Sequence, residues 1–173
     1  SSLGGIVGDS AVQRGIREWA VAWKYKHPSP WDFMFSMNRS LGRDLGWFWY
    51  YWLFATESVD GSIQSVRSTG PRTTVTVRQD GQMPSPVILR VHFASSGPAI
   101  RPMANATMQD ATTAVVTWPA DVWFGGSRTF DAVLDFGGRA IERIVLDPQC
   151  RFPDREPSDN VWPRAAGSTG RGC

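Results

Sequence analysis

The residue types that most often carry catalysis are sparse in this chain. A zinc hydrolase needs two or three imidazoles or thiolates around the metal, commonly two histidines four residues apart on one helix with a glutamate between them. The sequence has only His27 and His92, one in a His-Pro turn and one in an expected strand. A solvent-facing or hydrogen-bonded side chain is the favoured interpretation of each. We therefore expect no catalytic residue, no metal site and no cofactor site in this chain.

Other patterns typical of enzymes are absent as well. The sequence contains no G-x-S-x-G nucleophile motif, no P-loop and no G-x-G-x-x-G after a strand. Cys150 follows an expected strand with no histidine near it in sequence, so a cysteine nucleophile has little support. Cys150 and Cys173 are too few for a disulfide framework, and the sequence leaves their roles open.

Acidic side chains gather in one stretch near the C-terminal end. They belong to Asp147, Asp154, Glu156, Asp159 and the neighbouring Asn160. Such oxygens could in principle hold Ca²⁺, but their spacing matches no EF-hand loop. Arg151 and Arg155 lie among the acids, which favours a salt-bridged loop over a calcium site.

Composition indicates a folded protein. The 173 residues are 42% hydrophobic and 12% aromatic, which excludes a disordered chain. The formal net charge of +2 is nearly neutral, and basic residues are scattered among acidic ones. This pattern lacks the basic footprint of proteins that bind nucleic acids or anionic membranes, so we expect neither partner.

Residues 41–54, LGRDLGWFWYYWLF, contain an unusual aromatic run. Asp44 is a good N-cap, and every residue of 47–54 is aromatic or aliphatic. A helix that is apolar on all sides is normally buried on all sides. The run is too short to span a bilayer, which takes about 20 residues. We expect it to be buried in protein, at the joint between a helical half and a strand-rich half.

Tryptophan is concentrated at the front of the chain, with six of nine residues in the first 52. A few short helices cannot easily bury this much aromatic surface among themselves, so we expect them to pack against a larger body. The residues expected at that interface are Trp19, Trp23, Trp47, Trp49, Tyr50 and Trp52.

Two further helices are expected before the aromatic run. The first begins at Asp9 or Ser10 and runs to about Lys26, with one buried stripe. This stripe consists of Val12, Ile16, Trp19, Ala20 and Trp23. Pro28 ends the first helix, and Ser29 as N-cap with Pro30 at the first position opens the second. The second helix carries Phe33, Met34, Met37 and Leu41 on one side and stops at Gly42.

From Ser58 the hydrophobic period changes from 3.6 to 2, which predicts strands. The expected strands cover residues 62–68, 73–78, 87–94, 113–118, 129–136 and 141–146. Asp80-Gly81 marks a turn. Clean alternation in 74–77 and 87–93 predicts one packed and one solvated face. The predicted fold class is α+β: a helical segment over 1–57, an antiparallel immunoglobulin-like β-sandwich over 58–163 and a flexible tail over 164–173.

The order of these features resembles the C-terminal region of M1-family metallopeptidases, the aminopeptidase N-like gluzincins. The matching strings include REWAVAWKYKHPSPWDFMFSM (17–37), GRDLGWFWYYWLFATESVD (42–60), WPADVWFGG (118–126) and VLDPQCRFPDREPSDNVWP (145–163). KHPSPWDF and DLGWFW are the more specific of them. The resemblance covers the chain to about Pro163 and implies the closing helices of a catalytic domain followed by a β-sandwich. The zinc-binding HExxH segment of that family is absent from this sequence.

Two hypotheses follow. The first is a non-catalytic C-terminal part of an M1-like zinc aminopeptidase that braces the catalytic lobe, with zinc expected only in the catalytic segment outside this sequence. Its partner would be the catalytic domain of the same protein. The second is a stand-alone binding or assembly module that uses its aromatic helical face for another protein or a copy of itself. By resemblance, an extracytoplasmic location is plausible; substrate specificity stays open.

Overall fold

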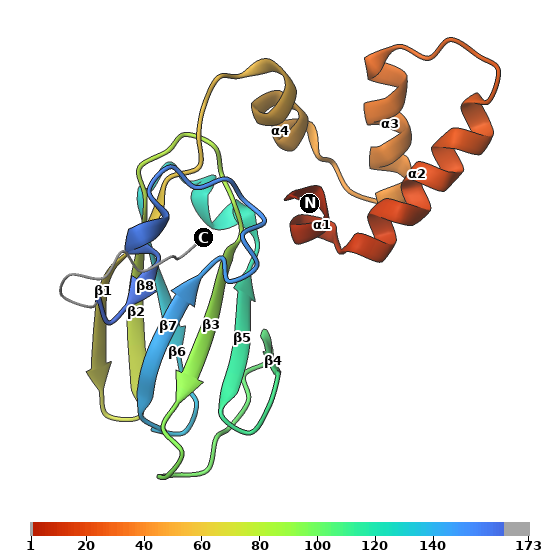
Figure 1. The fold of residues 1–173 in the computed structure, drawn as a ribbon. Helices are drawn as coiled ribbons and strands as arrows, with labels where there is room; N and C mark the ends of the chain where they lie inside the picture. Colours follow the sequence, from red (N-terminus) through yellow and green to blue (C-terminus); the bar gives the residue numbers. More distant parts are fainter. Residues whose placement is uncertain (1, 165–173) are drawn as a thin grey trace. The chain divides into compact units, whose positions relative to one another are not determined.

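The computed structural model describes residues 2–164 and divides into two units, residues 1–57 and 58–173 (Figure 1). We call them the helical unit and the β unit and describe each by itself. Residues 165–173, which include Cys173 and nearly all of the expected flexible tail, lie outside the described residues.

The helical unit contains four α-helices and one π-helical turn among its described residues. They are α1 (Ser2–Val7), α2 (Asp9–Trp23), α3 (Pro30–Leu41), α4 (Gly46–Trp49) and η1 (Tyr50–Phe54). The helices predicted to begin near Asp9 and at Pro30 are confirmed. The short helix α1 was not predicted, and the N-cap of α2 is Gly8 rather than Asp9 or Ser10.

Helix α3 has the ends that its sequence predicts. Ser29 Oγ accepts a hydrogen bond from the Asp32 amide at 3.3 Å, and Asp32 Oδ2 accepts one from the Ser29 amide at 2.8 Å. This reciprocal pair is a capping box, which satisfies amides that the first helical turn leaves unpaired. Gly42 ends the helix with a φ of 63°, a left-handed conformation that glycine adopts without steric cost.

The predicted buried stripe of α2 is wrong. Ile16 is 45% exposed and Ala20 is also exposed, whereas Val12, Trp19 and Trp23 are half-buried. The buried residue of α2 is Gly15, where a Cβ would lie 3.1 Å from the sulfur and terminal methyl of Met37. Helix α2 therefore packs on α3 through a close approach at a glycine, which leaves part of its apolar stripe in solvent.

The described residues bury the aromatic run on one side only, so its burial on all sides stays a prediction. Phe48 and Trp49 are buried, but Tyr50, Leu53 and Phe54 are 58%, 55% and 55% exposed. The run changes from α4 to the π-helical η1, in which the Ala55 amide donates to the Tyr50 carbonyl at 3.0 Å. The helical unit encloses one side of the run and leaves the other uncovered. Leu45 rather than Asp44 is the N-cap, although Asp44 Oδ1 accepts from the Gly46 amide at 2.8 Å.

The described strands of the β unit form two antiparallel sheets (Figure 1). The first has the order β1 (Gly61–Thr69), β2 (Arg72–Gln79), β6 (Thr129–Leu134). The second has the order β4 (Ala106–Met108), β5 (Thr113–Trp118), β3 (Val87–Phe93), β7 (Ile141–Leu146), β8 (Val161–Trp162). All six predicted strands are confirmed to within two residues at each end. The strands β4 and β8 were not predicted because two or three residues show no period.

One hydrophobic core joins the two sheets. Val75 and Val77 of β2 face Leu89, Val91 and other buried residues of the second sheet, and all four are at most 1% exposed. The alternation predicted for β2 and β3 is confirmed, since every second residue of both strands is buried. Each such side chain contributes about 1.5–3 kcal/mol when it leaves water.

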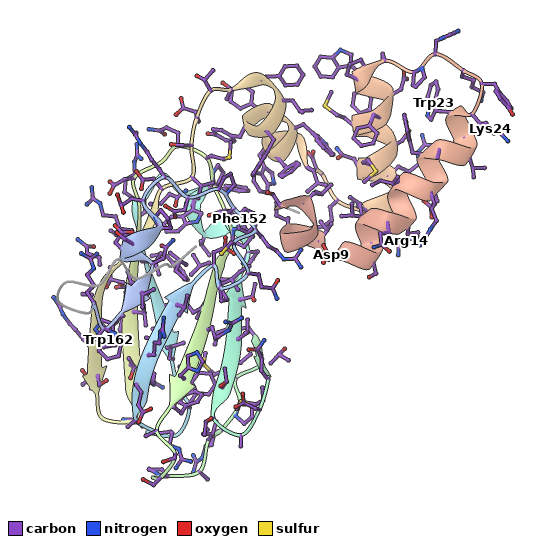
Figure 2. All side chains as sticks on the ribbon, viewed as in Figure 1. Asp9, Arg14, Trp23, Lys24, Phe152 and Trp162 are labelled. Carbon is purple, nitrogen blue, oxygen red and sulfur yellow. The ribbon has the colours of Figure 1, made fainter. Side chains whose placement is uncertain are left out.

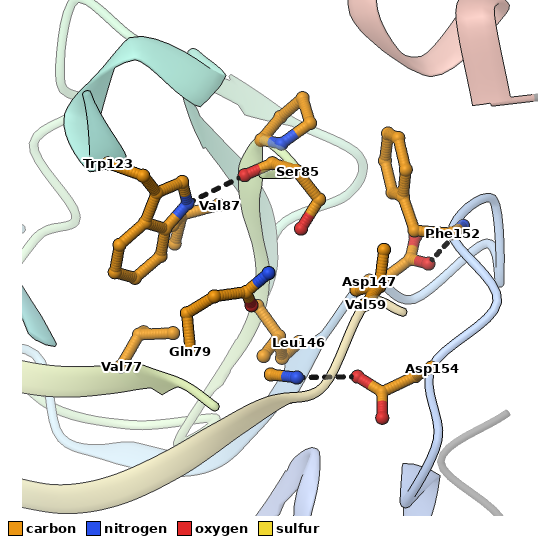
Figure 3. Close-up of a pocket in the computed structure, with 12 residues that line it drawn as sticks. Val59, Val77, Gln79, Ser85, Val87, Trp123, Leu146, Asp147, Phe152 and Asp154 are labelled. Atoms are coloured by element: carbon orange, nitrogen blue, oxygen red, sulfur yellow. Dashed lines mark hydrogen bonds between the residues drawn. The ribbon is translucent and has the colours of Figure 1, made fainter. Parts of the chain in front are cut away.

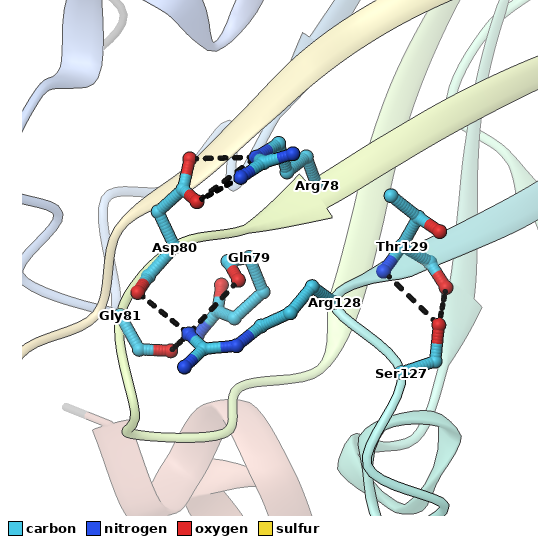
Figure 4. Close-up of polar contacts among 7 residues, drawn as sticks. All are labelled: Arg78, Gln79, Asp80, Gly81, Ser127, Arg128 and Thr129. Atoms are coloured by element: carbon cyan, nitrogen blue, oxygen red, sulfur yellow. Dashed lines mark hydrogen bonds and ion pairs between the residues drawn. The ribbon is translucent and has the colours of Figure 1, made fainter.

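The end of β2 is held by backbone contacts and two arginines (Figure 4). Arg78 forms a bidentate ion pair with Asp80, with a shortest N–O distance of 2.7 Å. Arg128 donates from Nη1 to the Asp80 carbonyl at 2.7 Å. The predicted turn dipeptide Asp80-Gly81 directly follows the last residue of β2. A Cβ on Gly81 would overlap the Ser58 carbonyl oxygen.

Gly81→Ala should therefore destabilise the β unit by about 3 kcal/mol, because the added methyl overlaps backbone that has little room to move. Urea unfolding followed by near-ultraviolet circular dichroism measures the change in the free energy of unfolding. Gly125→Ala is the matched control, because a Cβ at that position would have no atom within 4 Å. Equal unfolding midpoints for the two variants would show that the Gly81 contact is not restrictive.

Candidate functional site

The pocket at one end of the β unit is too small for a ligand. Its volume is about 10 Å³, which is room for a single water molecule (Figure 3). Trp123 Nε1 donates to the Ser85 carbonyl at 2.8 Å, and Gln79 Nε2 donates to the Met83 carbonyl at 2.6 Å. These polar groups hold neighbouring loops together and are not available for a substrate.

The acidic loop also has a structural role, and Asp154 is at its centre. Asp154 Oδ2 accepts from the Gly61 amide at 3.0 Å and from Asn160 Nδ2 at 3.2 Å, while its Oδ1 accepts from the Glu156 amide at 2.9 Å. Asp147 Oδ2 accepts from the Phe152 amide at 2.8 Å (Figure 3). The carboxylates thus tie the loop to itself and to the first residue of β1.

Burial acts on the carboxylates of this loop. Burial raises the pKa of Asp159 from 3.8 to about 6, against an opposing effect of Arg164. Burial also raises the pKa of Asp147, against the Phe152 amide hydrogen bond, and Arg151 lowers it slightly. The pKa of Asp60 is raised by burial and by the charge of Asp154, with Arg155 acting in the opposite direction. Arg151 and Arg155 act on Asp147 and Asp60 through their charge, and the salt-bridged loop expected from the sequence stays a prediction.

The other residues considered for catalysis belong to separate elements. His27 is exposed at the turn after α2, in the helical unit. His92 lies on β3 of the β unit, with Nδ1 3.4 Å from Thr113 Oγ1. Cys150 is disulfide-bonded. Within residues 2–164, no group of three or more histidine, cysteine, aspartate and glutamate side chains is arranged to hold a metal ion.

The candidate site is a pocket of about 240 Å³ in the helical unit, which we call the aromatic pocket. Its lining includes Trp31, Phe35, Tyr50 and Phe54, together with the buried Met34 and Trp49. The four aromatic side chains named first are between 55% and 68% exposed. Asn38, Asp44 and Gly46 supply the remaining lining. Helix α3 and the α4–η1 segment thus supply its two sides.

Ring contacts fix the shape of the aromatic pocket. Trp31 and Phe54 stack with ring centroids 5.4 Å apart and planes inclined by 12°. Trp49 donates from Nε1 to Asn38 Oδ1 at 2.8 Å and packs edge-on against Phe33 at 5.9 Å and Phe48 at 5.1 Å. Because Trp49 is held by a hydrogen bond and two ring contacts, it forms a rigid part of the lining.

The six residues predicted at an interface have different environments. Trp19, Trp23, Trp47 and Trp52 are half-buried, Trp49 is 7% exposed and Tyr50 is 58% exposed. Trp23, at the end of α2 in Figure 2, donates from Nε1 to Ser36 Oγ at 3.2 Å. Trp19 packs edge-on against Phe33 at 5.2 Å. Trp49 is thus buried within the helical unit, the other five residues keep accessible surface, and the interface stays a prediction.

On α3 and η1, sequence reasoning missed four exposed apolar side chains. They are Trp31, Phe35, Leu53 and Phe54. A signal was present for two of them, because Trp31 and Phe35 are four residues apart on α3 and therefore share a face, with Met34 between them and Met37 further around the helix. An apolar surface this wide on one helix indicates packing on more than one side.

Comparisons with known proteins identify no family. No family model matches this chain, and no curated protein matches it. Among solved structures, it is similar to the chitin-binding domain of a chitinase from Pyrococcus furiosus, with 20% identity and a TM-score of 0.33. That match covers 51% of this chain and 93% of the other, and a likeness this weak supports no inference. Across the described residues, no helix has the length and apolar character needed to cross a membrane.

The raised pKa of Asp159 predicts how stability changes with pH. The unfolded chain loses this proton near pH 4, whereas the folded chain keeps it to about pH 6. Between these values the unfolded state binds fewer protons, so this group lowers the free energy of unfolding as pH rises. Asp159→Asn should remove this loss, so its melting temperature relative to the native chain should rise from pH 4 to pH 7. Calorimetry at both pH values tests this.

Glu142→Gln, on an exposed position of β7, controls for the loss of one negative charge. The same rise in relative melting temperature for both variants would attribute the effect to net charge and contradict a specific role of Asp159.

Proposed function

We propose that this chain is the non-catalytic C-terminal part of an M1-like zinc metallopeptidase, in which the helical unit packs against the catalytic lobe and the β unit braces it. On this proposal the β unit is an immunoglobulin-like sandwich, and the chain is inactive without the catalytic segment. Two antiparallel sheets around a shared core support the first point. The sequence resemblance supplies the family.

The observation that carries the proposal is the uncovered aromatic surface of the helical unit. Trp31, Phe35, Tyr50, Leu53 and Phe54 are each more than half exposed, within 24 consecutive residues. Keeping such a side chain in water instead of in a packed interior costs on the order of 2 kcal/mol. A concentrated apolar surface of this kind marks a site of association with another protein or domain.

The interior of the helical unit supports the same conclusion. Its buried hydrophobic cluster consists of Met34, Met37, Leu45, Phe48 and Trp49. Other apolar residues pack against this cluster without being buried, among them Trp47 and Trp52. The cluster is small for a unit of this length, so a covering body would complete the interior as well as cover the surface.

The alternative function, a module that associates with its own copies or with another protein, would also use the aromatic surface. The metallopeptidase part and the module differ in which protein covers Phe35 and Phe54. In the first case the covering body is encoded next to this chain and carries HExxH; in the second it is a copy of the chain or an unrelated protein. The β unit has fewer such groups, with Phe124 and Val133 as its exposed large hydrophobic residues.

Determining the gene sequence immediately before the codon for Ser1 tests the proposal. An open reading frame that continues upstream through an HExxH segment is the expected result. A stop codon or a start codon at this position, with no such segment, would contradict it and favour the module.

The second test uses the upstream polypeptide as a separate chain, co-expressed with this one. Phe35→Ser and Phe54→Ser should each weaken co-purification by about tenfold or more, because exposed aromatic anchors dominate binding at interfaces. Val133→Ser, which changes an exposed apolar residue of the β unit, is the matched control and should not weaken it. Equal recovery for all three variants would contradict a role of the aromatic surface.

A further inference from the structure

The aromatic pocket has a composition that selects its occupant. Its apolar lining is provided by planar rings, with Trp31 and Phe54 stacked 5.4 Å apart and Tyr50 and Phe35 also exposed beside them. Its volume of about 240 Å³ is below the usual range of about 300–1,000 Å³ for sites that bind drug-sized ligands. A single side chain is therefore the appropriate size of occupant.

One carboxylate lies in this apolar setting. Asp44 is part of the lining, and its Oδ1 accepts from the Gly46 amide at 2.8 Å. Asp44 forms no ion pair with any lysine or arginine in the described part of the chain. An uncharged apolar occupant would remove water from this carboxylate without replacing its interactions, which is unfavourable. A cation would pair with it.

The amide oxygen of Asn38, which also lines the pocket, is already used. Asn38 Oδ1 accepts from Trp49 Nε1 at 2.8 Å, so the amide oxygen is engaged within the unit. The pocket therefore offers ring faces and one negative charge. Ring faces attract cations, most strongly those of tryptophan. A guanidinium stacks on aromatic rings and is more weakly hydrated than an ammonium, which favours arginine over lysine.

We propose that the aromatic pocket receives an arginine side chain of the partner surface, with the guanidinium stacked on the rings and paired with Asp44. The identity of the partner as the catalytic lobe rests on the proposed function; the preference of the pocket for a guanidinium does not. The contact fixes one position of the partner, because a single charged side chain must enter a pocket of side-chain size.

The test is a titration of the full chain with N-acetyl-arginine N-methylamide, followed by the indole N–H signals of Trp31 and Trp49 in ¹⁵N-labelled protein. The citrulline analogue has the same shape without the charge, and the leucine analogue tests a purely apolar occupant. We expect the arginine probe to bind about five- to tenfold more tightly than either analogue. Binding of the citrulline or leucine analogue at least as tight as that of arginine, or no movement of either indole signal, would overturn the proposal.

Asp44→Asn is the matching variant, because an amide oxygen can still accept from the Gly46 amide while the charge is lost. It should reduce the preference for arginine over citrulline to about one, whereas Glu57→Gln, an exposed acid outside the pocket, should leave the preference unchanged. An unchanged preference in Asp44→Asn would also overturn the proposal. The probe comparison on the native chain decides the question even if Asp44→Asn folds poorly.

The outcome is separable from that of the proposed function. Selective binding of the arginine probe together with an upstream gene that lacks HExxH would support the pocket and contradict the metallopeptidase role. An upstream HExxH segment together with no selectivity for arginine would support the metallopeptidase role and contradict the arginine pocket.

Discussion

The limited interior of the helical unit governs how its aromatic residues are distributed. Short helices joined by short turns enclose a small volume, and five hydrophobic residues fill it. Met37 is fully buried because it lies against Gly15, where the absence of a side chain lets α2 and α3 approach closely. Once this space is filled, further rings stay half-buried or exposed whatever their hydrophobicity.

The β unit buries its apolar side chains within itself to a much greater degree than the helical unit does. Its core draws on both sheets, and several residues of that core are fully buried. The loop that follows β7 is fixed where Asp154 accepts a hydrogen bond from the Gly61 amide at the start of β1, and Arg128 donates to the Asp80 carbonyl just after β2, at the same end of the sheet. A unit organised in this way suits the bracing role proposed for it, whereas the exposed rings of the helical unit suit the proposed contact with a partner.

The sequence predicted local structure better than burial. Ser29, Pro30 and Gly42 act through their own backbone and immediate neighbours, so the limits of α3 followed from a short stretch of sequence. The alternation of β2 and β3 was equally informative because a strand with one packed face shows a period of two. The exposure of Ile16 and Phe54 could not be predicted from a local pattern. It depends on how much interior volume the neighbouring helices enclose, and on the change to a π-helical turn at Tyr50. The pairing of Trp31 with Phe54 depends on the relative position of two helices that no local pattern records.

The strings that carry the resemblance to M1 metallopeptidases consist largely of residues with structural roles. In KHPSPWDF, Ser29 and Asp32 form the capping box. In the C-terminal string, Asp147 and Asp154 accept hydrogen bonds from backbone amides, and Asn160 is fully buried. Residues of this kind preserve a fold, and they would be needed equally in a brace for a catalytic lobe and in an independent module. The information about function is therefore in the exposed part of the same strings: Trp31 stands within the first, and nothing in the capping of α3 requires an indole at that position. Trp31 stacks on Phe54 and still keeps more than half of its surface in solvent, so the aromatic pocket offers ring surface to a partner under either function, whereas the capping and loop motifs offer none.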